Sequence, residues 1–392
     1  MTTDHLMHTY ARLPVAFVRG EGAWLWDEAG RRYLDALSGI AVCGLGHAHP
    51  AVAEAISRQA HTLLHTSNLY QMPLQAGVAD KLARLSGLDQ VFFCNSGAET
   101  NEAAIKLARL YGHEVRQLAE PKIVVFESSF HGRTLATLSA TGNAKIQQGF
   151  EPLVSGFVRC PYDDLAALED IARTEPDIVA VLVEPVQGEG GLRVPSAGFL
   201  PGLRALCDAQ GWLLMLDEVQ TGIGRTGHYF AFQHYEGLLP DVMSLAKGLG
   251  NGLPVGALLA RENVARLFGP GRHGSTFGGG QLAMAAAGAV LDTLEQEGLP
   301  NHARQMGDYL QSRLRERLGQ LPMVRTIRGQ GLMIGIDLSD PAPTLVRRAL
   351  DKGILINVTA ERVIRLLPPL IFSASEADLL VDRLGELLEE GL

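Results

Sequence analysis

Short runs of apolar residues recur along the chain, and most of them end at polar or small residues. Successive residues within a run are apolar, so each run is typical of a strand covered on both faces, as in a parallel sheet. Longer segments with helical periodicity follow some of these runs. This order predicts an α/β fold with a mostly parallel central sheet. The expected strands cover residues 91–94, 122–126, 178–183, 212–216, 242–246 and 255–260.

Weaker patterns flank this central part and predict a second, smaller unit. Near the N-terminus, residues 15–18 and 24–27 are strand-like and enclose polar and glycine positions that favour turns. After a long charged helix at 301–318, short apolar runs alternate with helical patterns. Strands are expected there at 332–337 and 363–366, and helices near 345–351 and 376–388.

Two of the central strands deliver chemically useful side chains to their carboxyl ends. Asp217 follows the run 212–216, and Lys247 follows the run 242–246 and precedes a glycine-rich stretch, 248–252. Carboxyl ends of parallel strands meet at one sheet edge, where open α/β sheets bind ligands. A lysine among apolar residues can form a Schiff base, and a carboxylate can pair with a pyridinium nitrogen. Pyridoxal phosphate (PLP) requires both a lysine and an acid of this kind. The alternative is that Asp217 caps a helix and Lys247 is a solvated loop residue.

The strand at 91–94 leads into a candidate phosphate site. Residues 95–102 form a small-residue turn that opens an amphipathic helix, and such a helix start presents free N–H groups to an anion. Ser96 is also a suitable N-cap, with Glu99 completing a capping box. The two roles are compatible. A second possible phosphate contact comes from the hydroxyl groups of the segment 274–280, which precedes the helix expected at 281–297.

Further candidates follow the remaining central strands. Phe130 could cover a flat ring, although it could equally belong to the core. Arg133 could hold a carboxylate through two hydrogen bonds, although it could also form a surface ion pair. Glu184 ends the strand 178–183, and the loop after it places Glu189 over the same sheet edge.

Composition excludes several classes of function. The chain has 392 residues, 46% of them hydrophobic, which is ordinary for a globular protein. Its net charge of -9 argues against nucleic acid as a partner. The first residues lack a signal-peptide pattern, and no segment is long and apolar enough to span a membrane. We therefore expect a cytoplasmic protein without a membrane partner. The four cysteines lie far apart, which favours reduced thiols over disulfides or zinc.

Two motifs match known patterns of metal or dinucleotide binding, but the residues around them do not support those functions. The histidine pairs 47/49 and 61/65 invite a metal site, but no acid or cysteine stands near them in a ligand pattern, so no metal is expected. Residues 222–227 match the dinucleotide fingerprint G-x-G-x-x-G. The segment after them does not open a helix and no acid ends the next strand, which argues against a nicotinamide site.

Taken in this order, the motifs closely resemble the class III PLP-dependent aminotransferases and, within them, the acetylornithine aminotransferases. The resemblance covers essentially the whole chain. It implies the PLP-dependent transferase fold of the aspartate aminotransferase type, with a large PLP-binding domain at 46–300 and a smaller α+β domain built from 1–45 and 301–392. The motifs are Asn95–Glu99, Phe130–Thr134, Glu184–Gly191, Leu216–Gly227, Ala246–Gly250 and Gly274–Gly279.

The resemblance also implies roles at the cofactor. Lys247 would bind the PLP aldehyde, and Asp217 would keep the ring nitrogen protonated. Phe130 would stack on the ring, and Gln220 would contact its phenolic oxygen. Thr276 would reach the phosphate from the neighbouring subunit of a homodimer with shared active sites. The other expected cofactor contacts are Ser96, Gly97, Ala98, Glu218 and Val219.

The implied substrates are N-acetylornithine and 2-oxoglutarate. Arg365 would bind the α-carboxylate of the oxo acid, and Glu189 would cover Arg365 in the other half-reaction. Arg133, Ser275 and Tyr10 are the further substrate contacts expected. His131 favours the acetylornithine branch, because ornithine aminotransferases usually have Trp at this position.

Other readings of the same motifs stay open. Ornithine, succinylornithine, succinyldiaminopimelate and 4-aminobutyrate are alternative donors within the family. A decarboxylase or an aminomutase of the same fold, or a protein that holds PLP without turnover, would also need Lys247 and Asp217. One departure from the family is Gly280-Gln281, where relatives usually carry Asn-Pro; it leaves the local turn open.

Overall fold

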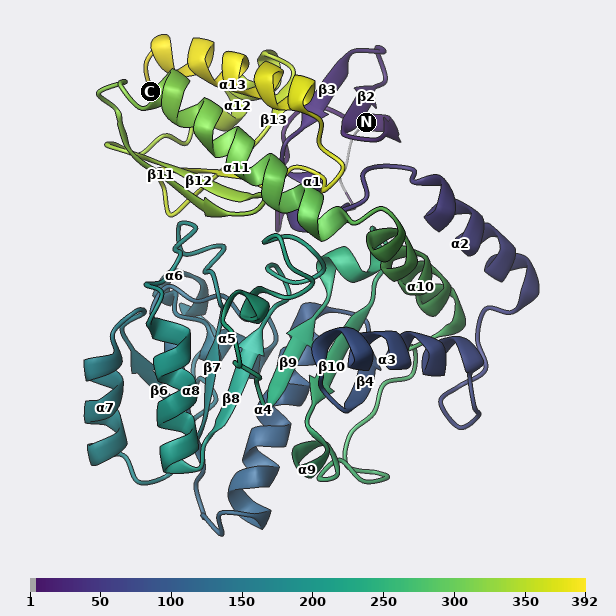
Figure 1. Cartoon of the computed structure of the whole chain (residues 1–392), viewed down its shortest axis with the longest axis vertical. Coiled ribbons are helices and arrows are strands. Elements are labelled where there is room, and N and C mark those ends of the chain that lie inside the picture. Colours follow the sequence, from purple (N-terminus) through teal and green to yellow (C-terminus); the bar gives the residue numbers. More distant parts are fainter. Residues whose placement is uncertain (1–4) are drawn as a thin grey trace.

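A seven-stranded sheet forms the centre of the computed structural model, which describes residues 5–392 (Figure 1). All neighbouring strands run parallel except β10, which is antiparallel to both of its neighbours. The prediction of a mostly parallel sheet is therefore confirmed. In spatial order the strands are β4 (Gln90–Cys94), β10 (Gly256–Ala260), β9 (Val242–Leu245), β8 (Leu213–Asp217), β7 (Ile178–Val183), β5 (Lys122–Phe126) and β6 (Phe157–Cys160).

Helices cover both faces of this sheet. On one face α4 (Gly97–Glu114) packs across β7, β8, β9 and β10. Its small buried residues, among them Ala103, Ala104 and Ala108, let the helix axis approach the strands closely. The other long helices of this part of the chain are α2 (Pro50–Thr62), α3 (Pro73–Ser86), α7 (Leu165–Thr174), α8 (Phe199–Gln210) and α10 (Gln281–Gln296).

The two ends of the chain meet in a second lobe (Figure 1). An N-terminal sheet of β1 (Phe17–Glu21), β2 (Trp24–Asp27) and β3 (Arg32–Asp35) is extended by β13 (Ile354–Leu355), which pairs with β3 in parallel. The other sheet of this lobe has the order β11 (Val324–Gln330), β12 (Met333–Leu338), β15 (Val363–Leu366), β14 (Asn357–Thr359). Its helices are α11 (Leu299–Leu318), α12 (Leu345–Asp351) and α13 (Ala374–Glu389).

We propose the domain division expected from the sequence, 46–300 against 1–45 with 301–392, because the pairing of β3 with β13 joins the two outer segments. Short helical segments complete the chain. They are α1 (Ser38–Ala41), α5 (Leu135–Ala140), α6 (Ala144–Gln147), α9 (Glu262–Ala265) and the 3-10 helices η1 (Ala231–His234) and η2 (Lys247–Gly250). Within residues 5–392, no helix is long and apolar enough to cross a membrane.

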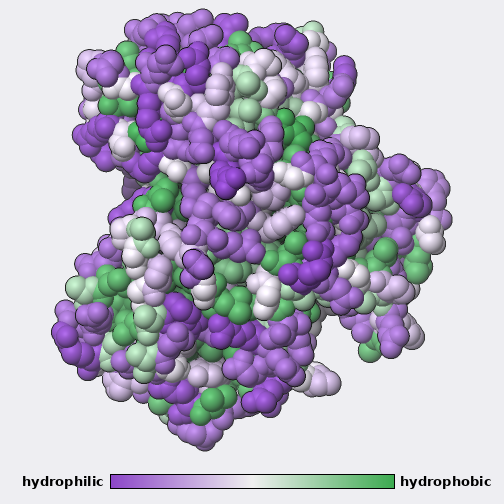
Figure 2. All heavy atoms as spheres, viewed as in Figure 1, coloured by the Kyte–Doolittle hydropathy of each residue, from purple (hydrophilic) through white to green (hydrophobic). Residues whose placement is uncertain are grey.

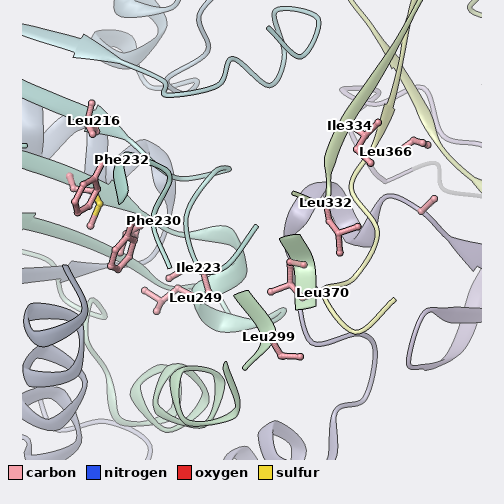
Figure 3. Packing of buried hydrophobic residues seen from close by; sticks show 14 of the residues in the cluster. Leu216, Ile223, Phe230, Phe232, Leu249, Leu299, Leu332, Ile334, Leu366 and Leu370 are labelled. Carbon is pink, nitrogen blue, oxygen red and sulfur yellow. The ribbon is translucent and has the colours of Figure 1, made fainter. Parts of the chain in front are cut away.

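One apolar core connects the two lobes. Figure 3 shows Leu216 and Phe230 beside the central sheet, Leu249 further along, and then Leu370 and Leu332 beneath the C-terminal sheet. Hydrophilic residues cover most of the outer face seen in Figure 2. Because close packing is lost when a core is sheared, this shared cluster fixes the position of the C-terminal sheet against the edge of the central sheet. The site described next lies at that edge.

Candidate active site

Asp217 and Lys247 line one cavity at the carboxyl edge of the central sheet. Asp217 is the last residue of β8, and Lys247 follows β9 after a single residue. These neighbouring strands are parallel, so the prediction that the two side chains meet at one edge is confirmed. The cavity has a volume of about 420 Å³, which lies in the range of small-molecule sites.

The surroundings of Lys247 favour a reactive amine. Burial lowers its pKa below the usual range, and the charge of Arg365 adds to this, while Glu189, Asp217 and Glu184 act against it. Its backbone has a φ of 33°, a conformation that costs a residue other than glycine about 1–3 kcal/mol. Within residues 5–392 its ammonium group has no ion pair. Lys247 is therefore free to react with a ligand in the cavity.

Three N–H donors fix the carboxylate of Asp217. Its Oδ2 atom accepts hydrogen bonds from Nδ1 of His131 at 2.8 Å and Nδ2 of Asn101 at 2.7 Å. Its Oδ1 atom accepts one from the backbone of Val219 at 3.1 Å. Asp217 is only 4% exposed, and it lines the cavity. Neither His131 nor Asn101 was predicted as a partner of Asp217.

The helix start at α4 provides a cradle for an anion. The side chain of Ser96 caps the helix by accepting from the backbone of Glu99 at 3.2 Å, as predicted. Gly97 and Ala98 occupy the first helical positions, whose N–H groups have no partner inside a helix, and both line the cavity. A Cβ on Gly97 would lie 2.7 Å from Val219, so only glycine fits beside that side chain.

An ion pair closes the side of the cavity that faces the C-terminal sheet. Nη1 of Arg365, on β15, lies 2.5 Å from Oε1 of Glu189. The arginine is fully buried and also donates through Nε to Asn357 at 3.1 Å. Its Nη2 atom has no partner among the described residues. A buried guanidinium with an unused N–H group is a ready site for a second carboxylate.

Phe130 and Arg133 form a further part of the cavity lining. The ring of Phe130 lines the cavity, and the guanidinium carbon of Arg133 lies 5.7 Å from the ring centroid. Arg133 is exposed and forms no ion pair within residues 5–392, so its guanidinium group is available to bind a carboxylate. Gln220 also lines the cavity, 3.5 Å from Nη1 of Arg365.

Five predicted residues do not line this cavity, and one of them is Arg365, described above. Tyr10 is 73% exposed, and Thr276 is exposed on the turn before α10. Ser275 lies beside the cavity, where its hydroxyl accepts from Asn95 at 3.2 Å. The carboxylate of Glu218 accepts from the backbone of Ala231 at 2.7 Å, with further donors from Phe232 and Thr221.

The prediction for Glu218 needs correction for a geometric reason. Successive side chains of an extended segment point to opposite sides, so Glu218 cannot face the cavity when Asp217 does. Burial raises the pKa of Glu218 to about 7, and the backbone donors of the following loop oppose that rise. We assign it a structural role in holding this loop.

The turn at Gly280 is regular. Its N–H donates to the carbonyl oxygen of Phe277 at 3.0 Å, and α10 starts at Gln281. The departure from the Asn-Pro of relatives therefore leaves the helix start intact.

Glu184 is a cavity residue that the sequence did not assign to a function. Its carboxylate accepts from the backbone of Phe130 at 2.9 Å and of Gly188 at 3.1 Å. Burial raises its pKa to about 7; the charge of His131 and these two N–H groups act against that rise. Through these two hydrogen bonds Glu184 links the backbone of Phe130 to the loop that carries Glu189. The position of Glu184 at the end of β7 was the available signal.

The cavity fits PLP by the chemistry of its donors. Asp217 offers an anionic oxygen for a ring nitrogen, Lys247 an amine for an aldehyde, and α4 free N–H groups for a phosphate. The described residues contain no group of histidines, cysteines and acids that could hold a metal ion. The histidine pairs have other contacts: His47 bonds Asp35 at 2.8 Å and His65 packs on Phe277.

Known proteins resemble this chain over almost its whole length. A family model described as aminotransferase class-III matches residues 6–388. An acetylornithine aminotransferase from Nitrosomonas europaea is 57% identical over 385 residues, 98% of each chain. The crystal structure of the acetylornithine aminotransferase from Elizabethkingia anophelis has a TM-score of 0.88 at 37% identity, covering 99% of this chain and 97% of that one. An ornithine aminotransferase structure from Toxoplasma gondii, described with partial PLP occupancy at the active site, has a TM-score of 0.94 at 35% identity, covering 99% and 93%.

Fold and cavity together define a PLP-dependent transferase. Within that class the chain belongs to the class III aminotransferases. PLP is therefore its cofactor, as the strand-end lysine and acid predicted.

Proposed function

We propose that this enzyme moves the terminal amino group of N-acetylornithine to 2-oxoglutarate, giving N-acetylglutamate semialdehyde and glutamate, a step of arginine biosynthesis. The relative from Nitrosomonas europaea, 57% identical over nearly the full chain, carries the name of this activity. The observation that supports it in the structure is a pair of arginines at the cavity that holds Lys247: Arg133 lines the cavity, and Arg365 bonds to its lining residues Glu189 and Gln220. A donor with its amine far from its carboxylate needs a cation at a distance from the reacting lysine, and Arg133 supplies one.

Lys247 would carry the proton in each half-reaction. PLP, when bound, supplies an electron-withdrawing ring that accepts the electron pair left on the substrate carbon. Because burial lowers the pKa of Lys247, its amine would be available as a base for the proton of the substrate carbon. Asp217, held by His131 and Asn101, would keep a proton on the ring nitrogen. Phe130 would cover one face of the ring, and Gln220 would contact its phenolic oxygen.

The second substrate explains the ion pair at Arg365. The α-carboxylate of 2-oxoglutarate would displace Glu189 and bind Arg365, while its distal carboxylate would bind Arg133. In the donor half-reaction Glu189 would cover Arg365 and keep ordinary α-amino acids from binding there. Ser275, beside Asn95 at the cavity edge, would contact substrate.

We propose a homodimer with shared active sites. Asn68 donates to the carbonyl oxygens of Ser275 and Gly278, both at 3.0 Å, and so joins its own loop to the turn of Thr276. Large apolar side chains are exposed on these two loops, which is typical of an interaction surface. They are Leu64, Leu69, Tyr70 and Phe277. Thr276 would reach the phosphate of the partner subunit's cofactor.

We also propose a cytoplasmic location, because all four cysteines are free thiols, as is usual in a reducing compartment.

The test is a panel of amine donors with 2-oxoglutarate, scored by glutamate formation. The panel contains N-acetylornithine, N-succinylornithine, succinyldiaminopimelate, ornithine and 4-aminobutyrate. N-acetylornithine should give the highest kcat/KM. A higher value for ornithine or 4-aminobutyrate would overturn the substrate assignment. Spectral change without any glutamate would instead support a protein that holds PLP without turnover.

A further inference from the structure

The loop that carries Glu189 is fixed at its base and at its tip. At the base, Gln187 and Arg193 exchange two backbone hydrogen bonds of 3.0 Å each. At the tip, the carbonyl oxygen of Glu189 accepts from the hydroxyl of Thr359 on β14. The base is thus part of the central lobe, while the tip is held by the C-terminal sheet.

Arg328, on β11 of that sheet, holds the descending side of the loop. Its Nε donates to the carbonyl oxygen of Leu192 at 2.8 Å, and its Nη2 donates to that of Gly191 at 2.7 Å. Its Nη1 donates to Asp337 at 3.0 Å, which sets the plane of the guanidinium. Three planar N–H directions are used at once, a pattern that lysine cannot reproduce.

The loop has room to move if this hold is lost. Behind it lies a polar cavity of about 600 Å³, lined by Gly190, Gly191, Arg328 and Asp337 among others. Gly191, which has a φ of 95°, adds no side-chain contact that would hold the loop. The hydrogen bonds of Arg328 therefore hold the loop at a place where a cavity, and not packed side chains, lies next to it.

We propose that Arg328 is a positioning residue for donor specificity: it holds the loop so that Glu189 stays paired with Arg365. This inference rests on the proposed function of that pair. Arg328 does not line the substrate cavity, and its hydrogen bonds go to Leu192, Gly191 and Asp337, so it acts through the loop backbone. When Arg328 is lost, Glu189 leaves Arg365 more often, and α-amino acids gain a carboxylate site beside Lys247.

The chain offers a charge-conserving variant and a matched control. Arg328→Lys keeps the positive charge but loses the forked contact with the two carbonyls. Arg362→Lys is the control, because Arg362 lies against the same cavity and pairs with Asp337 at 3.0 Å without contacting the loop carbonyls. Asp337→Asn is a second test variant that leaves Arg328 in place but removes the acid that orients it.

The first measurement is the ratio of kcat/KM for L-alanine to kcat/KM for N-acetylornithine in the holoenzyme. Arg328→Lys should raise this ratio about fivefold or more, and Asp337→Asn should raise it in the same direction. Arg362→Lys should leave it unchanged. In a Glu189→Ala background, Arg328→Lys should add less than about twofold, because the group that it positions is gone. An unchanged ratio in folded Arg328→Lys, or effects that multiply in the double variant, would overturn the proposal.

The second measurement does not depend on the substrate. Amide hydrogen exchange of residues 187–193 in the holoenzyme should be faster in Arg328→Lys than in wild type and in Arg362→Lys. Equal exchange in Arg328→Lys and wild type overturns the proposal. If wild type does not use N-acetylornithine, the proposed function fails, and this exchange result still decides whether Arg328 holds the loop.

Discussion

Nδ1 of His131 lies 2.8 Å from Oδ2 of Asp217, and both side chains are buried. The carboxylate accepts from Nδ1, so the proton of His131 sits on that atom, and Nε2 has no partner among the described residues. Asn101 donates to the same oxygen from the neighbouring helix α4. Two side chains from different elements therefore orient the acid that would meet the ring nitrogen of PLP.

Asp217→Asn should keep the fold and lower kcat by about 10²-fold or more, because a neutral amide cannot hold the ring nitrogen protonated. Steady-state kinetics with N-acetylornithine and 2-oxoglutarate measure the loss. His131→Gln should lose less, since Asp217 keeps its charge and two other donors. Turnover of Asp217→Asn near that of wild type would exclude the ring-nitrogen role.

Lys247→Ala should abolish turnover and remove the absorbance band of the lysine-bound cofactor. Lys145→Ala is the control, because Lys145 is an exposed lysine paired with Glu361. Absorbance spectra and single-turnover assays of both variants provide the comparison. A variant without Lys247 that kept the band and normal activity would show that another lysine binds the cofactor.

Arg133→Ala should raise the KM of both substrates by about 10-fold or more, because each loses a charge-assisted hydrogen-bonded partner for its distal carboxylate. Arg133→Lys should recover part of the loss, since it keeps the charge but not the fork. The two KM values are measured separately by varying one substrate at a time. An effect on N-acetylornithine alone would contradict the shared role.

Mixed dimers should regain activity if active sites are shared. Provided that Lys247→Ala subunits and Thr276→Ala subunits are each inactive alone, the mixture should recover some turnover, because one of the two sites then contains both Lys247 and Thr276. Native mass spectrometry verifies that hybrid dimers form. If proven hybrids stay inactive, Thr276 acts within its own subunit.

The stability of the fold should fall at alkaline pH through His47. Burial alone would lower the pKa of His47, but its contacts with Asp35 and Cys43 raise it from 6.5 to about 9. The folded state thus binds this proton more tightly than the unfolded chain. The resulting stabilisation, roughly 1–3 kcal/mol, is full below about pH 6.5 and disappears as pH rises through about 9.

Thermal unfolding at about pH 6 and about pH 9.5 tests this dependence. The Tm of wild type should drop more between the two values than that of His47→Gln, which cannot lose a proton at this position. Equal drops in the two proteins would show that other groups set the alkaline stability.

The parts of the site that could be predicted from sequence are those encoded locally. An apolar run that ends in a polar residue places that residue at a strand end, which located Asp217, Lys247 and Glu184. The capping of α4 by Ser96 is also local, within a few residues. These features need no knowledge of which strands become neighbours.

The remaining features depend on long-range pairing. His131 and Asn101 are 86 and 116 positions from Asp217, and no local pattern marks them as its donors. Glu218 was expected at the site from the family resemblance, whereas alternation along the strand turns it to the other side. The hold of Arg328 on the loop of Glu189 joins residues that are more than a hundred positions apart.

The parallel pairing of β3 with β13 has a consequence for synthesis of the chain. Residues Arg32–Asp35 reach the ribosome exit long before Ile354–Leu355, so the N-terminal sheet stays one strand short through most of translation. Its open edge is exposed during that period, when unpaired strands are prone to associate with other chains. The central sheet, whose strands lie between residues 90 and 260, can be completed first. The lobe that carries Arg365 thus acquires its final form only after the PLP-binding edge already exists.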